Sequence, residues 1–428
     1  MTTRVDVIVV GAGSTGAAAS AFLAEHGLRV VCLERRALSD AGACWVNGVP
    51  RAAFIRAGVA LPGPEESDGQ PAPFHLIAPT GRAHVPSHDV LEVDMRQLVA
   101  RLQARAHAAG ADLRAGVTVR GREGDRLDTS AGPVHARWIV DASGVAGARL
   151  LGQPAVARHH LCAAAQEVRA VTDPSAAAAF FAGHGVALGE VLGLVGVAGG
   201  YSVLNLRLHR GGTVGILTGS IPALGFPSGR ALLDAFVAAH PWVGARLSGG
   251  SGAIPLRRAH DRLADDRVAL LGDAGCQVFP AHGSGVGSGL VAARLLADTL
   301  ATGGTLRDYE VAWQREHGGL FAFFDVFRRW NQGVDSAVLG RAMGRGLLDA
   351  DALRAGIDQV LPRPAPRALA GKLRALLGEP ALAWSLAATV ARSAAVRAVY
   401  AAYPTHPADV PAWARSVDWL VGEPTATP

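Results

Sequence analysis

Short runs of apolar residues alternate with helical segments at the start of the chain. Residues 5–10 form one continuous apolar run, residues 17–28 are rich in alanine, and residues 29–33 form a second short run with β-branched side chains. Such short, uninterrupted runs are typical of strands buried on both faces of a parallel sheet. The pattern therefore predicts strand, helix and parallel strand over residues 4–34.

Similar segments recur farther along. Residues 94–109 have a helical period that Gly110 ends, and residues 111–119 favour a further strand. Two short apolar strands are predicted at residues 138–142 and 267–273. Residues 62–79 are rich in Pro, Gly and acidic residues, which predicts a loop.

Residues 156–260 have a different pattern. Alternating and Gly-rich segments, such as 201–208 and 213–218, predict strands, and a helical period occurs only at 230–240. Alternation of this kind is typical of an antiparallel sheet with one face on a core. Helices are then predicted from 284 to about 300, from 309 to 330 and, between prolines, from 347 to 403, before a frayed tail at 422–428.

These patterns predict an α/β protein with a Rossmann-like domain, an inserted antiparallel sheet domain that binds substrate, and C-terminal helices. We assign residues 1–75, 95–155 and 262–330 to the Rossmann-like domain, residues 76–94 and 156–261 to the inserted domain, and residues 331–428 to the helical region.

Composition narrows the class of protein and of partner. The 428 residues are 50% hydrophobic and 18% charged, which is typical of a folded globular protein. The net charge is +5, but the basic residues are scattered and not interleaved with aromatic ones, so we expect no nucleic-acid partner. The four cysteines lack CxxC spacing and a His cluster, which argues against a metal site and a disulfide framework.

Targeting signals are not evident, so we expect a cytoplasmic protein. The first strand follows Met1 almost directly, and no window reaches the roughly 18 apolar residues that a membrane span requires. The basic stretch 367–397 has Arg and Leu/Ala at helical spacing, and it could make peripheral contact with a membrane. Packing of that stretch against the body is the expected alternative.

The turn after the first strand fits G-x-G-x-x-G, a dinucleotide-binding fingerprint. Gly11 permits a tight turn, Gly13 lets the backbone approach a pyrophosphate, and Gly16 lets the helix pack closely on the strand. The helix N-terminus, which includes Ser14 and Thr15, offers amide donors and the positive end of a dipole to the phosphates.

Glu34 ends the second strand, where its carboxylate can accept hydrogen bonds from a ribose diol. We assign Glu34, the adjacent Arg35 and Val119 to the cofactor site. The fingerprint does not distinguish NAD from FAD, so the identity of the cofactor has to be inferred from motifs in the remainder of the chain.

A Gly-Asp pair ends the predicted strand at Asp273, and P-x-x-G-x-G follows at residues 280–285. Here the chain resembles the FAD-binding oxidoreductases of the para-hydroxybenzoate hydroxylase fold (GR2 type), and among them the geranylgeranyl reductase family. The resemblance implies that Asp273 contacts the FAD ribitol and pyrophosphate, and that Gly283, Gly285 and Val286 lie beside the flavin ring. A helix N-terminus there would stabilise an anionic reduced flavin.

Three other segments resemble the same family. Arg96 leads a helix and is similar to an arginine that reaches the cofactor, residues 138–144 resemble a second cofactor motif that includes Asp141, and residues 253–255 have a counterpart before the Gly-Asp strand. The second motif is Asp-Ala-Ser-Gly instead of Asp-Gly. The resemblance therefore implies FAD, and it leaves open whether NAD(P)H or another reductant is the electron donor.

Cys44 and His282 are the candidate catalytic residues. Cys44 corresponds to the Cys-bearing loop of geranylgeranyl reductases, which faces the flavin, although a small buried hydrophobic residue is an equal alternative. A redox pair of Cys44 with Cys276 is a further hypothesis. His282 could relay protons, with a purely positioning role as its alternative. For Tyr201 we expect a core tyrosine with a hydrogen-bonded hydroxyl, rather than one that faces the pocket.

The resemblance implies a reductase or dehydrogenase that transfers hydride between flavin N5 and a carbon–carbon bond of a small hydrophobic substrate. An isoprenoid or polyketide-like secondary metabolite, free, carrier-bound or lipid, fits this chemistry. A monooxygenase that hydroxylates an aromatic or polyketide substrate through a C4a-hydroperoxide has almost the same motifs. A flavin-dependent halogenase is less expected, because the chain lacks a Trp-x-Trp-x-Ile-Pro segment and its one lysine is Lys372. A flavoprotein without catalysis is a further alternative.

Apolar residues of the inserted domain are candidates for the pocket lining or, equally, for the core: Phe180, Phe181, Leu192, Leu194, Val203 and Leu217.

Overall fold

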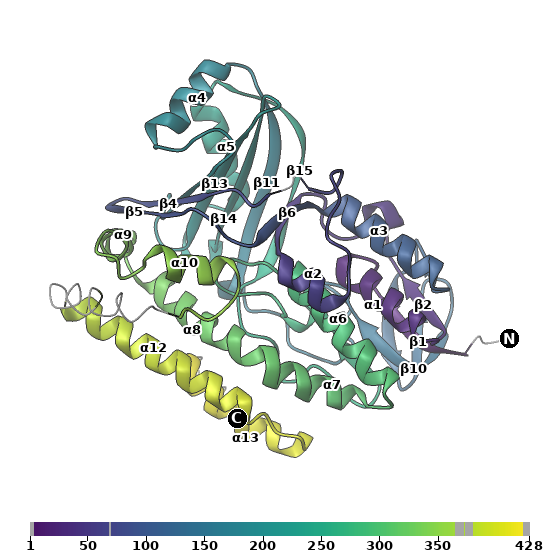
Figure 1. Ribbon diagram of the computed structural model, residues 1–428. Coiled ribbons are helices and arrows are strands. Elements are labelled where there is room, and N and C mark those ends of the chain that lie inside the picture. Colours follow the sequence, from purple (N-terminus) through teal and green to yellow (C-terminus); the bar gives the residue numbers. More distant parts are fainter. Residues whose placement is uncertain (1–3, 68–69, 364–371, 373–379, 423–428) are drawn as a thin grey trace.

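The computed structural model describes residues 4–67, 70–363, 372 and 380–422. Figure 1 shows two sheet-containing lobes, with the C-terminal helices along one side of both. The first lobe carries the N-terminal strand and the second carries the long strands β11 to β15.

The first sheet is largely parallel and has the order β7-β2-β1-β10-β9-β8, with β16 beside β10. Strand β1 pairs in parallel with β2 and β10, while β9 pairs with β10 in the antiparallel sense. Helix α1 (Ser14–Glu25) joins β1 to β2, so the strand–helix–strand unit predicted over residues 4–34 is confirmed. The strands are β1 (Arg4–Val10), β2 (Val30–Leu33), β7 (Asp112–Arg114), β8 (Val119–Glu123), β9 (Arg126–Thr129), β10 (Val134–Asp141) and β16 (Val268–Leu270).

The second sheet has the order β15-β11-β14-β13-β12-β4-β5, and all its pairs are antiparallel except β12 with β4. A separate two-stranded antiparallel sheet pairs β3 (Val46–Pro50) with β6 (Val90–Asp94). The strands of the second sheet are β4 (Phe74–Ala78), β5 (Gly81–Val85), β11 (Leu161–Val171), β12 (Val191–Val195), β13 (Ser202–His209), β14 (Thr213–Ser220) and β15 (Val243–Pro255).

Two local predictions for this lobe were wrong. Residues 62–79 were predicted as a loop, but β4 occupies 74–78, because it gains backbone partners on both sides from β12 and β5. A single helix was predicted between 156 and 260, but α4 (Pro174–Gly183) precedes α5 (Gly229–Ala239). Asp173 caps α4 by accepting a hydrogen bond from the Ala176 amide, with proline at the first helical position, which is a recognisable start signal.

The two faces of the second sheet differ in burial, and this difference positions the site. On one face, residues such as Leu204, Leu206, Val214 and Ile216 pack under α4 and α5. On the other face, the alternate residues of β11 and β13 are mostly half-buried. That second face is therefore free to contact a ligand or other elements.

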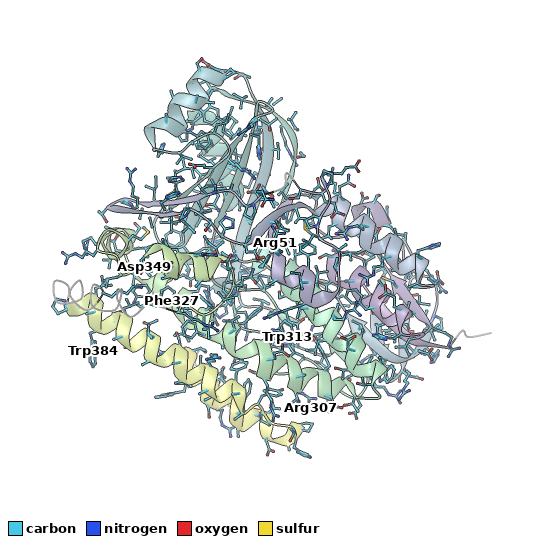
Figure 2. All side chains as sticks on the ribbon, in the orientation of Figure 1. Arg51, Arg307, Trp313, Phe327, Asp349 and Trp384 are labelled. Carbon is cyan, nitrogen blue, oxygen red and sulfur yellow. The ribbon has the colours of Figure 1, made fainter. Side chains whose placement is uncertain are left out.

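The remaining helices complete the first lobe and the C-terminal side. Helix α12 packs on α8 through Val396 and Tyr400 against Ala322 and Val326. Figure 2 shows Trp313 within the body and Trp384 directed outward from α12. The helices are α2 (Arg51–Ala57), α3 (Met95–Ala108), α6 (Val286–Ala301), α7 (Leu306–Trp313), a π-helical turn (Gln314–Gly318), α8 (Gly319–Gly333), α9 (Ser336–Gly344), α10 (Ala350–Ile357), α12 (Pro380–Ala401) and α13 (Val410–Val421).

Some C-terminal predictions concern residues that the structure does not describe. Residues 367–371 and 373–379 of the basic stretch and 423–428 of the predicted tail are among them. Within the ranges that the structure describes, no helix has both the length and the hydropathy needed to cross a bilayer.

Helices α1 and α6 approach each other closely around Thr15. A Cβ added to Gly289 of α6 would lie 2.1 Å from Thr15 Oγ1, and one added to Gly272 would lie 2.8 Å from the same atom. Real side-chain carbons do not approach so closely, so glycine at these positions sets the spacing of the two helices.

We predict that Gly289→Ala destabilises the protein by about 1–3 kcal/mol, the usual cost of overpacking a tight interface. The double variant Thr15→Ala/Gly289→Ala should recover most of this loss. Without the Thr15 hydroxyl, the nearest atom of residue 15 is its Cβ, which lies 3.3 Å from the Cβ added at position 289. Urea unfolding of both variants measures the effect. Gly183→Ala, at a helical glycine with open space around it, is the matched control and should be neutral or stabilising. Equal losses at Gly183 and Gly289 would contradict the packing argument.

Candidate cofactor and active site

The glycine turn between β1 and α1 brings backbone against backbone. Gly11 has φ +99°, and a Cβ there would lie 2.5 Å from the carbonyl oxygen of Ala142. A Cβ on Gly16 would lie 1.8 Å from the carbonyl oxygen of Gly11. Helix α1 therefore begins as close to the carboxyl ends of β1 and β10 as the chain permits.

Helices α1 and α6 both begin at a glycine, Gly13 and Gly285, and neither has a capping side chain among the described residues. Helices α3, α4, α5, α7, α9 and α10 instead begin with an Asp, Ser or Thr that accepts from a first-turn amide. The first amides of α1 and α6, which include those of Ser14, Thr15 and Val286, are thus available to a bound anion or carbonyl oxygen.

Asp273 lies where these two helices meet. It sits in the 3-10 turn Gly272–Gly275, and a Cβ on Gly285 would lie 3.0 Å from its Oδ1. Its half-buried carboxylate accepts no hydrogen bond from any residue that the structure describes. Desolvation raises the pKa of Asp273 to about 6. A carboxylate left without partners in this position fits a hydroxyl-bearing ligand such as a ribitol chain.

Glu34 is held at the glycine turn. It is buried, Oε2 accepts from the Ala12 amide at 2.9 Å, and Oε1 accepts from the Arg36 amide at 3.0 Å. The amide of Val117 donates to the carbonyl oxygen of Glu34, which brings the segment before Val119 beside it. The carboxylate is therefore fixed beside the turn that would receive a dinucleotide.

A cavity of about 540 Å³ adjoins the same turn. Its wall includes Gly42, whose Cα would be 3.2 Å from a Cβ on Gly13. Two arginines that line it, Arg36 and Arg96, suit a diphosphate. Arg36 rather than the predicted Arg35 lines the cavity. The lining residues are Arg36, Ser39, Asp40, Ala41, Gly42, Ala43, Cys44 and Arg96. Together with the uncapped helices and Asp273, these residues fit FAD.

Asp141 is directed into the protein. It is fully buried, Oδ1 accepts from the Ser143 amide at 3.1 Å, and Oδ2 accepts from the Leu150 amide at 3.0 Å. These bonds shape the loop after β10, which contacts Gly11 through Ala142. Its contact with the cofactor, predicted from the second motif, would therefore be indirect.

Cys44 and Cys276 have different surroundings. Cys44 lines the cavity, and its Sγ lies 3.7 Å from the carbonyl oxygen of Gly249 in β15. Cys276 is fully buried, its Sγ is 3.4 Å from Nε2 of His260, and burial raises its pKa to about 12. Both thiols are free in the described chain, so their redox pairing stays a hypothesis.

His282 binds a helix rather than another titratable group. Its Nε2 is 3.2 Å from the carbonyl oxygen of Gly356 in α10, so this nitrogen carries the hydrogen and donates it. Desolvation by neighbouring protein atoms lowers the pKa of His282, although the residue is exposed at the surface. A neutral ring with its N–H engaged favours the positioning role over proton relay.

The loop around Gly283 rests on the half-buried face of the second sheet. Gly283 has φ +75°, and a Cβ there would lie 3.0 Å from Ile254 and 3.2 Å from Leu256. The hydroxyl of Ser284 donates to the carbonyl oxygen of Gly48, which ties the loop to β3. Residues beside the predicted flavin ring thus contact both lobes.

Next to this loop, the sheet face carries small and apolar residues, most of which the sequence analysis did not identify as site residues. Ala164 is opposite Gly219 and Gly252, and Gly219 is opposite Val203. The next row along the strands pairs Gln166, Leu217 and Asn205. Only strand register identifies such rows, because the residues come from separate strands.

Trp45 borders the same face. A Cβ on Gly250 or Gly252 would lie 3.0 Å from its ring, so the indole rests on the glycines of β15. Of the apolar residues considered for the pocket, Val203 and Leu217 lie on this face. Phe181 and Leu192 belong to the core under α4 and α5, and Phe180 and Leu194 pack against it.

We predict that Asp273→Asn raises the melting temperature of the apoprotein at neutral pH and leaves it unchanged at about pH 4. The folded pKa of Asp273, about 6, lies above its ordinary value, so the stability that the protonated form gives is lost as pH rises through 6. Asparagine mimics the protonated form at every pH. Thermal unfolding of both apoproteins across this range measures the difference, and a variant less stable than wild type at neutral pH would refute the assignment.

Comparison with known proteins agrees with these motifs. A family model described as FAD binding domain matches residues 4–41. The digeranylgeranylglycerophospholipid reductase of Sulfolobus acidocaldarius is 27% identical over 187 residues, which cover 41% of this chain and 40% of that relative. The enzyme of the same name from Methanothrix thermoacetophila is 27% identical over 360 residues, which cover 74% of this chain and 84% of that relative. The first match thus spans less than half of the relative's length.

Solved structures share the fold. A geranylgeranyl bacteriochlorophyll reductase-like protein from Thermoplasma acidophilum has a TM-score of 0.69 at 17% identity, with 90% of this chain and 99% of that chain covered. The halogenase PltM has a TM-score of 0.62 at 16% identity, with 98% and 96% covered. PqsL, a probable FAD-dependent monooxygenase from Pseudomonas aeruginosa, has a TM-score of 0.55 at 16% identity, with 83% and 99% covered.

At these identities the solved structures establish the fold alone, while the FAD-binding model and the two reductases match in sequence as well. The chain therefore has the FAD-binding fold of para-hydroxybenzoate hydroxylase type, and in sequence it is similar to reductases of the geranylgeranyl type.

Proposed function

We propose that this chain reduces a carbon–carbon double bond of a hydrophobic substrate, an isoprenoid or a polyketide-like compound. FAD, when bound and reduced, supplies the hydride. NAD(P)H or another reductant is the electron donor in this proposal. The protein's contribution is to hold the substrate against the flavin, exclude water and supply a proton.

The observation that carries the proposal is the half-buried sheet face at the loop around Gly283, where its side chains are small and apolar. Near this loop the face consists of Ala164, Val203 and two glycines, Gly219 and Gly252. Side chains this small leave room for a bulky or extended apolar substrate. The first charged side chain that the structure describes on this face of β13 is Arg207, and it is paired with Glu92.

The Cys44 loop supplies an apolar wall to the proposed site. Cys44 and Trp45 stand between the cavity beside the glycine turn and the glycines of β15. The indole gives the site an apolar wall, which helps to exclude bulk water from it. The names of the two matched relatives describe reductases of an isoprenoid lipid, which supports the same substrate class.

A monooxygenase is the second candidate, because the fold match to PqsL covers most of both chains. A halogenase is disfavoured by the one lysine of the chain. Lys372 Nζ lies 2.8 Å from Asp349 Oδ2 at the start of α10, so its ammonium group is engaged in an ion pair. Asp349 is labelled in Figure 2, near helices α9 and α10.

The test is anaerobic reduction of the purified holoprotein with NADPH, NADH and dithionite in turn, followed by addition of a polyprenyl or polyene acceptor. We expect the flavin to be reoxidised by the acceptor and the product to have gained two hydrogens. Reoxidation only by oxygen, with a hydroxylated product, would favour the monooxygenase instead. A protein that binds no flavin would refute both.

Ala164→Leu tests whether the half-buried face binds the substrate. A leucine there would fill the space beside Gly219 and Gly252, so we expect KM for the acceptor to rise about tenfold or more, equivalent to about 1.4 kcal/mol. FAD content should not change. Ala163→Leu is the matched control, because the neighbouring side chain on β11 points to the opposite face. Equal effects of the two variants would place the substrate elsewhere.

A further inference from the structure

The amide of Gln166, on the half-buried sheet face, is bound by no other residue that the structure describes. Three glutamine side-chain oxygens are buried without a hydrogen-bond partner among the described residues, those of Gln153, Gln166 and Gln314. The amide nitrogens of Gln153 and Gln314 still donate to backbone carbonyl oxygens, at 3.4 and 2.8 Å. Gln166 differs because both ends of its amide lack a partner in the described chain.

An unpaired carbonyl oxygen inside a protein is unusual. Buried polar groups are nearly always hydrogen-bonded, because burial without a partner forfeits the hydrogen bonds that water would make. A binding site is a place where such an oxygen has a reason to occur, since a few polar groups in an apolar wall orient the ligand. The position of Gln166 therefore decides what its amide can do.

Strand pairing places Gln166 at the proposed substrate site. The residue is opposite Gly250 of β15 and Leu217 of β14. A Cβ on Gly250 would lie 3.0 Å from Cys44 Sγ and from the Trp45 ring. Cys44 also lines the cofactor cavity. The amide is therefore next to the residues that stand between the cofactor cavity and the sheet.

The amide is also remote from the loop around Gly283. That loop rests on Ile254, which is opposite Cys162 of β11. Ala164 lies between Cys162 and Gln166 on the same face. A strand rises about 3.4 Å per residue, so about 14 Å of strand separate Cys162 from Gln166. A ligand group bound by the amide is thus far along the molecule from a bond that reacts beside the loop.

The surrounding charges indicate that this ligand group is uncharged. Glu167, the next residue in the chain, is on the opposite face, where Arg230 of α5 binds it. On the face of Gln166, Arg207 of β13 is paired with Glu92. These charges already have partners of opposite sign. A charged group beside the amide would be buried with only a neutral partner, which is costly.

A hydroxyl group fits the amide. It can donate to the carbonyl oxygen or accept from the amide nitrogen, so it pairs with either end of the side chain. An ether or ester oxygen can only accept, so it would leave the buried carbonyl oxygen unpaired. The hydroxyl is therefore the uncharged group that completes the site.

We propose that Gln166 binds a hydroxyl group of the substrate, and that this hydrogen bond determines which double bond lies beside the loop around Gly283. The proposal rests on the reductase function proposed above. The substrate is then an isoprenoid or polyketide-like alcohol whose hydroxyl is remote from the bond that is reduced. Small apolar side chains alone would let such a chain slide along the face, whereas one hydrogen bond holds it at a single position.

The experiment uses reduced holoenzyme under anaerobic conditions with three acceptors. Geranylgeraniol has several double bonds and a hydroxyl at one end, its hydrocarbon analogue has hydrogen in place of that hydroxyl, and ferricyanide accepts electrons without binding as an alkene. The dependence of flavin reoxidation on acceptor concentration, measured by stopped flow, gives Kd and the maximal rate. One equivalent of enzyme is then used in a single turnover, and NMR of the product locates the reduced bond.

Wild type should bind geranylgeraniol about tenfold or more tightly than the hydrocarbon, because a site built for a hydroxyl is left unpaired by an analogue that lacks it. A single turnover should reduce mainly one double bond, remote from the hydroxyl. Gln166→Met keeps the length of the side chain and removes its hydrogen bonds. This variant should bind both alkenes equally and reduce the alcohol at several positions.

Other properties of Gln166→Met should not change. Its FAD content and its reoxidation by ferricyanide should match wild type, and its melting temperature without substrate should not fall, because the variant removes an unpaired oxygen. Asn205→Leu is the matched control. Asn205 is in the same row of the sheet, but its Oδ1 lies 3.1 Å from the position of a Cβ on Gly193, so its amide leans toward β12. This variant should keep the preference for the alcohol and the single product.

Each failure has a separate signature. If Gln166→Met keeps the preference for the alcohol and the single product, the role of Gln166 is overturned while the reductase function stands. If wild type binds both alkenes equally, the hydroxyl is overturned. If the variant loses FAD, the amide binds the cofactor and the substrate assignment is overturned. If wild type is reoxidised by ferricyanide but by neither alkene, the reductase function fails and the role of Gln166 fails with it.

Discussion

The close contact of α1 with β1 and α6 is the constraint on which the cofactor site depends. Glycine at 11, 16, 272 and 289 removes the side chains that would keep these backbones apart, and Thr15 fills the remaining space. The contact brings two helix N-termini together without capping side chains. Two positive dipole ends and free amides then converge beside Asp273, an arrangement that favours an anionic cofactor.

A buried charge cluster holds the end of the sheet face where Tyr201 lies. Burial alone would raise the pKa of Asp325, but the charges of Arg328 and Arg329 hold it well below its usual range. The same carboxylate accepts from the Arg258 amide at 3.2 Å, and Arg258 in turn binds Asp418 of α13 at 2.5 Å. Residues from before α6, from α8 and from α13 are thus joined around one carboxylate, which is costly to disturb because removal of one partner leaves the others buried and unpaired.

The sequence predicted the elements whose signals are local. The strand–turn–helix–strand unit, the Gly-Asp motif and the helices after Gly283 each have a motif or a period within a few tens of residues, and they are present in the parts of the chain that the structure describes. Helix α4 also had a local signal, Asp173 before proline, which the alternating strands around it obscured.

Features that depend on distant residues could not be predicted. Strand β4 follows a segment rich in Pro, Gly and acidic residues, and it forms because β12 and β5 lie on either side of it. The contact of Cys44 with Gly249 joins residues 205 apart. The unpaired carbonyl oxygen of Gln166 is a property of its surroundings, because the neighbours of this side chain come from other strands through the pairing of β11.

Both sides of the sheet face beside the loop around Gly283 are held by packing. On the β15 side, Trp45 rests on glycine backbone at contact distance, and any shift there must displace a strand. On the other side, α9 packs on β4 and β5 through an apolar cluster that includes Ala78, Ala342 and Met343. A Cβ on Gly81 of β5 would lie 2.0 Å from the carbonyl oxygen of Gly340, so backbone meets backbone there as well. Exposed hydrogen bonds contribute little beside such contacts, because water competes for the same donors and acceptors. The fold therefore gives this face a fixed wall at both edges.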